Sequence, residues 1–157
     1  MDAIVLLKND HKNVKALFKK LKGHDVSVVP DICTELTVHA EIEEKIFYPA
    51  IRECVVALDV NEAYEEHHVV KVLIEELQAM SPDDDYYEAK AVVLMEMVEH
   101  HVEEEEGELF PDVREAFGRN RLQELGAELE AMKADLTAAV PTSRSARAKN
   151  ARIAVPA

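Results

Sequence analysis

The stretch HHVEEEEGELFP, residues 100–111, contains two histidines and five glutamates and ends in Phe-Pro. A second stretch, HAEIEEKIFYP at residues 39–49, repeats its spacing. In each, a histidine precedes two adjacent glutamates by 4 and 5 residues and a proline by 10: His39, Glu43, Glu44 and Pro49 in one, His101, Glu105, Glu106 and Pro111 in the other. Residues four apart lie above one another on an α-helix, so each stretch predicts a histidine and a glutamate on one helical face.

The composition predicts a single all-helical domain that contains both stretches. The chain has 157 residues, of which 48% are hydrophobic, with only 4 glycines and 6 prolines, as suits helices that share one core. No apolar run reaches the ~18–20 residues of a membrane span, and the N-terminus lacks the pattern of a signal peptide, so a cytoplasmic protein is expected. The net charge of −14 argues against a nucleic-acid partner, because phosphate contacts need basic residues.

Apolar periodicity and capping residues predict five helices. Their expected limits are Asp2 to Gly23, residues 27–31 to about Ala57, a start at Asp59, a start at Ser81 with Pro82 in the first turn, and Arg119 to Ala139. Cys33 and Cys54 then fall on one helix, roughly 30 Å apart at 1.5 Å per residue, too far to form a disulfide. We expect both to be buried as small hydrophobic residues.

An internal repeat relates the two halves of the chain. The segment DHKNVKALFKKL (10–21) matches EHHVVKVLIEEL (66–77) in its acid, its histidine and its apolar offsets. Together with the repeated stretch above, this predicts an up-down-up-down four-helix bundle over residues 1–117. An accessory helix over 118–140 and a basic, flexible tail over 141–157 are expected to follow.

Each bundle helix is expected to point a histidine into the core, because His11, His39, His67 and His101 lie on the apolar stripes. Glu43 and Glu105 join them on the second and fourth helices. One inward histidine is most often an ordinary core residue. Two buried carboxylates beside four imidazoles, however, would carry a large desolvation cost without a cation, so the pattern predicts a metal site. Nitrogen and oxygen ligands without thiolate disfavour structural zinc and suit iron or manganese.

The full pattern, DH (10–11), HxxxEE…YP (39–49), EH (66–67) and HxxxEE…FP (101–111), resembles the hemerythrin-like, HHE cation-binding domain family over about residues 1–117. The resemblance implies two non-haem iron ions with oxo or hydroxo and carboxylate bridges. Glu43 and Glu105 would bridge the irons, and the other ligands would be the four histidines His11, His39, His67 and His101. Oxygen-carrying members have a fifth histidine four residues before the third-helix ligand, where this chain has Ala63.

The missing histidine implies exchangeable positions on both irons, which suits reaction with O2, peroxide or nitric oxide more than stable oxygen storage. Tyr64, three residues before His67, is a candidate to bind an iron or to hydrogen-bond the centre, and Glu44 and Glu106 are candidates to surround the ligands. No residue can be assigned a catalytic role from the sequence.

Two further functions stay open beside that reactivity. The first is a redox or iron-sensing or iron-handling module read by a protein partner, with the lysines of the first helix, the fifth helix or the basic tail as its docking surface. The second is donation of iron to iron–sulfur centres, known among relatives, for which the two cysteines lack a thiol-motif spacing. Any electron donor would have to be a separate molecule, because the sequence contains no nucleotide or haem motif. The oligomeric state is not predicted.

Overall fold

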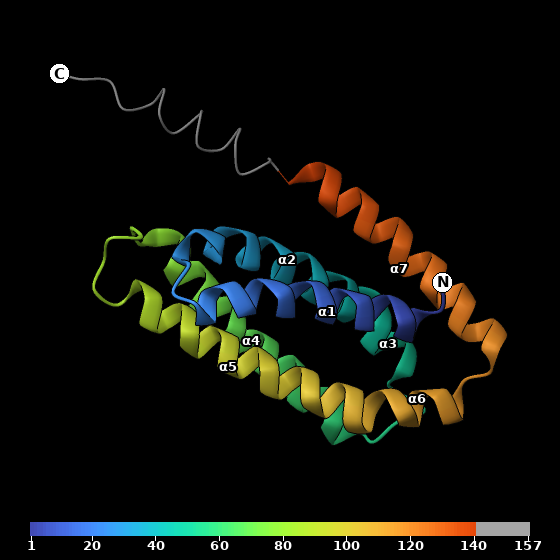
Figure 1. The fold of residues 1–157 in the computed structure, drawn as a ribbon. Coiled ribbons are helices and arrows are strands. Elements are labelled where there is room, and N and C mark those ends of the chain that lie inside the picture. Colours follow the sequence, from blue (N-terminus) through green and yellow to red (C-terminus); the bar gives the residue numbers. More distant parts are fainter. Residues whose placement is uncertain (141–157) are drawn as a thin grey trace.

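The computed structural model describes residues 1–140, all-helical throughout, and the predicted tail at 141–157 lies outside them. Four long segments run side by side as a bundle (Figure 1). In chain order these are α1 (Ala3–Lys22), α2 (Val29–Ile42) continued by α3 (Tyr48–Ile51), α4 (Ala57–Ala79), and α5 (Tyr87–Glu104) continued by α6 (Phe110–Ala116). A short 3₁₀ turn, Val26–Val28, connects α1 to α2. The predicted four-helix bundle is therefore confirmed.

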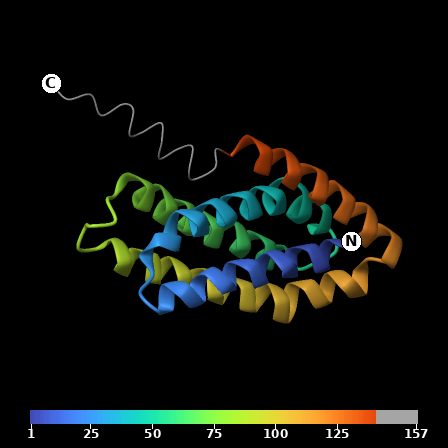
Figure 2. The same cartoon turned by 45° about the horizontal axis from the view of Figure 1, so that its top comes forward.

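The accessory helix α7 (Arg119–Ala139) crosses one end of the bundle against α1 and α2 (Figures 1 and 2). Its apolar stripe is buried at Leu122, Leu125 and Leu129, in the same cluster as Ile4 and Leu7 of α1. The additional C-terminal helix is confirmed, and it shares its core with the bundle. Among residues 1–140, no helix is long and apolar enough to cross a membrane.

Three predicted helix limits are wrong. The second helical segment ends at Ile51 and not near Ala57, which leaves Cys54 half-buried in the following turn while Cys33 is buried as expected. α4 begins at Ala57 after Val56, without the side-chain cap expected from Asp59.

The third error concerns the start of α5, which begins at Tyr87 and not at Ser81. Asp84 Oδ2 accepts a hydrogen bond from the Ser81 backbone N–H at 2.8 Å, and Ser81 Oγ accepts one from Asp83 at 3.3 Å. These local bonds hold residues 81–86 as turns, because short polar side chains compete with helical backbone bonding.

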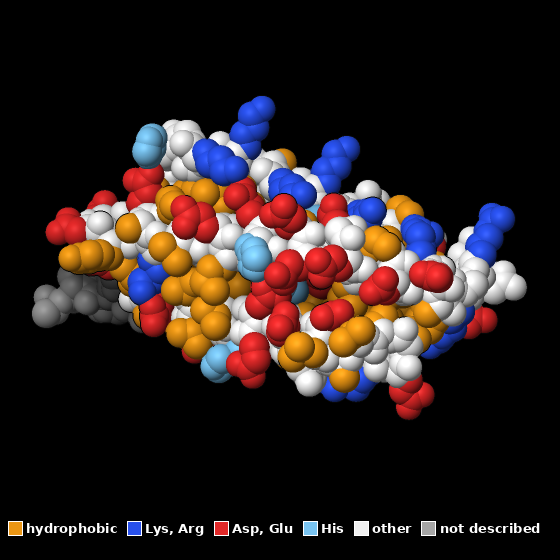
Figure 3. All heavy atoms as spheres, turned by 90° about the horizontal axis from the view of Figure 1, so that it is seen from below, with side chains coloured by type: hydrophobic (Ala, Val, Ile, Leu, Met, Phe, Trp, Pro, Cys, Tyr) orange, Lys and Arg blue, Asp and Glu red, His pale blue; other side chains and the backbone are white. Residues whose placement is uncertain are grey.

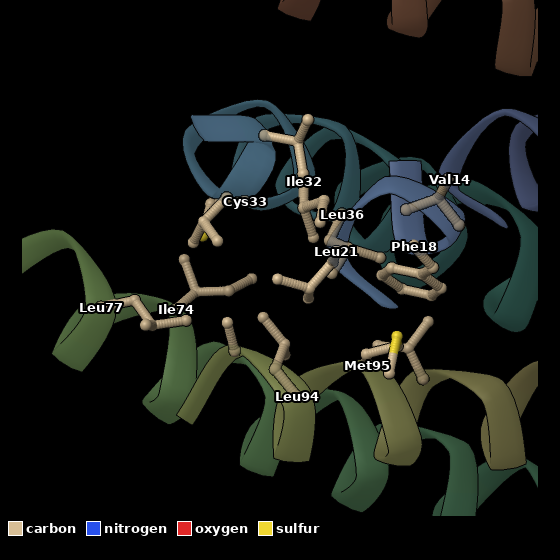
Figure 4. Close-up of a cluster of buried hydrophobic side chains, with 14 of the residues drawn as sticks. Val14, Phe18, Leu21, Ile32, Cys33, Leu36, Ile74, Leu77, Leu94 and Met95 are labelled. Carbon is tan, nitrogen blue, oxygen red and sulfur yellow. The ribbon is translucent and has the colours of Figure 1, made fainter. Parts of the chain in front are cut away.

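The bundle core consists of two apolar clusters. One surrounds Phe18, Ile32, Ile74 and Leu94, residues that converge from all four helices (Figure 4). The other contains Ile4, Phe47, Val60 and Leu109. On α1, α2 and α4 the inward histidine falls between the residues of the first cluster and those of the second, and on α5 His101 lies next to Val102, the last first-cluster residue of that segment. A polar layer therefore crosses the middle of the bundle.

Candidate metal centre

Each repeated motif contains one π-helical turn. These turns cover Glu43–Phe47 and Glu105–Leu109, and the N–H groups of Tyr48 and Phe110 bond the carbonyls of Glu43 and Glu105, five residues earlier. Each turn ends just before a proline, whose ring would crowd the carbonyl four residues earlier in an α-helix. A wider turn accommodates the ring, so the helix continues past Pro111.

The π turn also changes which residues face inward. In a regular α-helix, Tyr48 would lie about 140° around the axis from Glu43, at 100° per residue. The extra residue in the turn rotates it back, and Tyr48 is fully buried. Phe110 is turned inward in the same way and is 1% exposed. Each motif therefore places a buried aromatic residue one π turn after the inward glutamate.

The structure brings together the six side chains predicted as metal ligands. Each glutamate directs one oxygen to the His11–His39 pair and the other to the His67–His101 pair. Glu43 Oε1 lies 3.0 Å from His39 Nε2, and Glu43 Oε2 lies 3.1 Å from His67 Nε2. Glu105 Oε2 lies 3.3 Å from His11 Nε2, and Glu105 Oε1 lies 3.2 Å from His101 Nε2.

These contacts define two overlapping groups of potential ligands that share both glutamates. The first group adds the His11–His39 pair and the second adds the His67–His101 pair, with the ligand atoms of each group within 4.8 Å of one another. Within the pairs, the facing Nε2 atoms are 3.1 and 3.2 Å apart. Each group offers nitrogen and oxygen donors that could hold a metal ion.

The hydrogen bonding of the carboxylates supports the same fit. Among the described residues, Glu43 Oε1 and Glu105 Oε2 are buried and have no hydrogen-bond partner, although imidazole nitrogens lie close to both. Buried polar atoms normally find a partner, and a buried charge is stable when it is paired or binds a metal. The donor set therefore suits a cation, and neither Cys33 nor Cys54 belongs to it.

The charges at the centre shift the ionisation of its groups. Burial alone would lower the pKa of His39, but the Glu43 carboxylate and the bond to Asp10 raise this pKa to about 10. Burial and Glu105 oppose ionisation of Glu43, yet His39 and His67 hold the pKa of Glu43 below its usual range. The pKa of Glu105 is lowered by His101 and His11 against the effect of burial. Carboxylates facing imidazolium groups are thus the favoured form of the metal-free protein.

A second set of carboxylates contacts the outer Nδ1 atoms of the four histidines. Three contacts are hydrogen bonds: Asp10 to His39 at 3.1 Å, Glu66 to His101 at 3.0 Å and Glu106 to His11 at 2.8 Å. Glu44 lies 3.4 Å from His67 Nδ1 without forming one. Such partners orient imidazoles toward a metal and increase their basicity.

These four contacts follow the internal repeat. Asp10 and Glu66 directly precede an inward histidine and reach the histidine of the next bundle helix, whereas Glu44 and Glu106 directly follow an inward glutamate. The positions predicted for Glu44 and Glu106 around the ligands agree with these contacts. Asp10 and Glu66 were not assigned a role from the sequence, although the acid before each inward histidine is the signal that identifies them.

Tyr48 is the central residue that the sequence reasoning missed. Its hydroxyl lies 3.1 Å from Glu43 Oε2 and also hydrogen-bonds Glu105 Oε1, with His67 Nε2 at 3.3 Å. Burial, followed by the two glutamate charges, raises the pKa of Tyr48 well above its usual range, so the phenol keeps its proton in the metal-free protein.

Tyr64, the tyrosine singled out from the sequence, lies further from the ligands. Its hydroxyl donates to the backbone carbonyl of Glu44 at 3.1 Å, and its ring packs edge-on against Tyr48 with centroids 5.3 Å apart. Tyr64 therefore supports Tyr48 and the Glu44 backbone.

Comparison with known proteins agrees with this geometry. The hemerythrin HHE cation-binding domain family matches residues 2–113. A hemerythrin HHE cation-binding domain-containing protein from Mycobacterium kansasii has the same fold, with a TM-score of 0.74 and 24% identity over 87% of each chain.

A curated relative differs in length. A protein named DNA nickase, from Nostoc sp., is 29% identical over 136 residues, which cover 83% of this chain and 39% of the relative. The chain thus spans about two fifths of that protein. The family match, which extends over all four bundle helices and every predicted ligand, shows that this chain belongs to the hemerythrin HHE cation-binding domain family.

Proposed function

We propose that this protein is a non-haem di-iron protein whose centre binds or reacts with O2, peroxide or nitric oxide. The observation that carries the proposal is the division of the two glutamates, each with one oxygen at the His11–His39 pair and one at the His67–His101 pair. Two iron ions would supply the electrons for binding or reducing such a ligand. The imidazole and carboxylate donors suit iron among the first-row metals.

The six predicted ligands would have two roles in this centre. Glu43 and Glu105 would hold the two ions close together, and each histidine pair would hold one ion. Two histidines and one oxygen from each glutamate would hold each ion with four protein ligands, which would leave room for a small molecule. The Tyr48 hydroxyl holds a proton next to both glutamates, where it can hydrogen-bond an oxygen or nitrogen atom of the bound molecule.

Anaerobic iron reconstitution tests the proposal. The chain should take up close to two irons, and a Glu43→Ala/Glu105→Ala variant should lose them. A Glu35→Ala/Glu103→Ala variant, altered on the same two helical segments at exposed positions, is the matched control and should still bind two. An unchanged iron content in the first variant would refute the centre.

Stopped-flow mixing then separates the possible reactions. The reduced protein is mixed in turn with O2, H2O2 and nitric oxide, and its visible spectrum is followed. A long-lived oxygenated form indicates a carrier, and rapid conversion to the diferric form indicates an enzyme or a sensor. If it is an enzyme, it is an oxidoreductase that needs a separate electron donor.

The second candidate function is a sensing or iron-handling module read by a partner. One contact favours it: Lys133 of α7 donates a hydrogen bond to Asp10, whose other oxygen contacts the ligand His39. The accessory helix is thereby connected to the metal centre. If iron loading leaves the protection of α7 amides from hydrogen exchange unchanged, this candidate is excluded.

DNA nicking is not proposed for this chain. The net charge of −14 and the acidic face over α4 and α5 (Figure 3) would repel phosphate groups. The matched segment is also a minor part of the Nostoc protein.

A further inference from the structure

A small pocket connects the surface between α4 and α5 to the candidate metal centre. Its volume is about 40 Å³, and its inner wall contains the predicted ligands His101 and Glu105. The rest of the lining is mostly acidic, from Asp59, Glu62, Glu66, Glu104 and Glu108. A pocket of this size admits a water-sized molecule or a single ion.

A small side chain lies in the wall of the pocket on the α4 side. Ala63 lines it and is 2% exposed. A methyl group fills much less of the space between α4 and the π turn at Glu105 than an imidazole would. The small Ala63 side chain thus leaves space beside His101 and Glu105.

Three side chains form a separate cluster of potential ligands beside this pocket. His100 Nε2 lies 3.1 Å from Glu104 Oε1 and 4.0 Å from Glu66 Oε2, and the ligand atoms of all three residues fall within 4.8 Å of one another. The His100 side chain is 65% exposed. Figure 3 shows acidic side chains gathered around a histidine near the middle of this face. None of these three residues belongs to the predicted di-iron ligand set.

Glu66 connects the surface cluster to the buried centre. Its Oε1 accepts a hydrogen bond from Nδ1 of the ligand His101 at 3.0 Å, while its Oε2 faces His100. At the inner end of the pocket, Glu105 is 2% exposed, and its Oε1 lies 3.2 Å from Nε2 of His101, which also lines the pocket. Acceptor oxygens therefore occur at both ends of a path that starts at the surface.

We propose that Glu66, His100 and Glu104 form an outer divalent-cation site that captures Fe2+ and passes it through the pocket to the di-iron centre. This inference rests on the proposed di-iron function. One imidazole and two carboxylates, with water in the remaining positions, suit a hydrated first-row ion. Exposed ligands keep the binding weak, so the ion can leave again.

The charge of the pocket supports the capture of cations. No lysine or arginine lines it, so the acidic walls concentrate cations in a narrow space between low-dielectric helices. Anions such as azide or nitrite are repelled by the same walls, while neutral O2, H2O2 and nitric oxide are not. The pocket thus favours the entry of cations, excludes anions and still admits uncharged molecules.

The test compares two double variants that remove the same residue types. His100→Ala/Glu104→Gln removes two ligands of the outer site but none of the inner centre. The matched control, His68→Ala/Glu103→Gln, alters an exposed histidine and an exposed glutamate on α4 and α5 that do not line the pocket. Glu66 is left unchanged because it also orients His101.

Equilibrium binding is measured first, with Mn2+ as the probe and iron-loaded protein. The electron paramagnetic resonance signal of unbound Mn2+ should reveal one more weak site in the wild type and the control than in His100→Ala/Glu104→Gln. An equal number of weak Mn2+ sites in all three proteins would overturn the outer site.

Fe2+ uptake by the chelator-treated protein is followed second, anaerobically and at low ionic strength. The initial rate should fall by roughly tenfold in His100→Ala/Glu104→Gln relative to the control, and the difference should shrink as salt is added. Equal uptake rates would overturn the transfer role. All three proteins should finally hold two irons, and a different final content in the wild type would instead refute the di-iron proposal.

Discussion

The Tyr48 hydroxyl lies 3.1 Å from Glu43 Oε2 and also contacts Glu105, so one phenol joins the two glutamates at the middle of the bundle. The π turn makes this contact possible, because it rotates Tyr48 onto the face of Glu43. A tyrosine in the motif HxxxEE…YP thereby becomes part of the centre, while its counterpart in the other repeat, Phe110, stacks on the ring of His11 with centroids 5.8 Å apart. The two halves of the bundle therefore differ at this position.

Replacing Tyr48 with phenylalanine should destabilise the metal-free protein. The two buried glutamates lose their shared hydrogen-bond donor, at a cost of about 1–3 kcal/mol. Iron should still bind, because the six predicted ligands are unchanged. Thermal unfolding and iron content measure the two effects, with Tyr64→Phe as the control, whose hydroxyl contacts only the Glu44 carbonyl. A metal-free Tyr48→Phe protein that melts at the wild-type temperature would contradict the prediction.

Lys133→Met should weaken iron binding although Lys133 touches no ligand. Without the Lys133 amine, Asp10 is held less firmly against His39. Loss of a direct partner such as Asp10 typically lowers metal affinity by about 10–100-fold, so the decrease in Lys133→Met should be smaller than that. Competition with a chelator gives the affinity. Lys12→Met, at an exposed position on α1, is the control. Retention of wild-type affinity in Lys133→Met would mean that α7 does not influence the centre.

The metal-free protein should be most stable between about pH 4.5 and 6.5. The pKa of His39 is raised from 6.5 to about 10, so its contribution is complete below pH 6.5 and is lost as the pH rises through 10. The pKa of Glu43 is lowered from 4.5 to about 2, so its contribution is present above pH 4.5 and is lost as the pH falls through 2. Melting temperatures across this range, after treatment with a chelator, test the profile.

Bound iron should change how the stability of the protein depends on pH above about pH 7. Bound histidines are neutral ligands, and metal binding releases their protons. The iron-loaded protein should therefore keep its stability between pH 7 and 9, where the metal-free protein loses part of its own. If the metal-free protein instead becomes steadily more stable from pH 7 to 10, the imidazolium–carboxylate pairs do not exist.

Gly126→Ala should detach the N-terminal segment from α7. A Cβ atom at this position would lie 2.0 Å from the Met1 carbonyl oxygen and 2.9 Å from the Ala3 backbone nitrogen, so the backbone must move. Overpacking of this kind costs about 1–3 kcal/mol. Thermal unfolding and proteolysis near the N-terminus measure the loss.

Gly107→Ala is the matched control for this substitution. Among the described residues, its Cβ would meet no atom within 4 Å outside the backbone of its own helical turn. Alanine in place of a helical glycine should instead add about 0.5–1 kcal/mol of stability. If both variants melt alike, close packing of Gly126 against the N-terminus is not important.

Much of the bundle could be predicted because its signals are local or repeated. The apolar stripes, Asp2 as the cap of α1 and Gly23 at its end all agree with the structure. The prediction that α5 begins at Ser81 is wrong, because the side chains of Asp84 and Ser81 bond the backbone of their own turn. Capping residues and turn residues are the same types, so sequence alone did not separate the two outcomes.

The sequence by itself determined the all-helical bundle, its internal repeat and the inward direction of four histidines and two glutamates, because a period of 3.6 residues assigns each residue a face. Only the tertiary structure decided which oxygen meets which histidine, and that Tyr48 and not Tyr64 lies against the glutamates. Helical periodicity assumes a regular helix, and the π turns break that regularity just before each proline. The contacts of Asp10, Glu66 and Lys133 likewise depend on how neighbouring helices are placed, and the spacing of residues within one helix does not predict that placement.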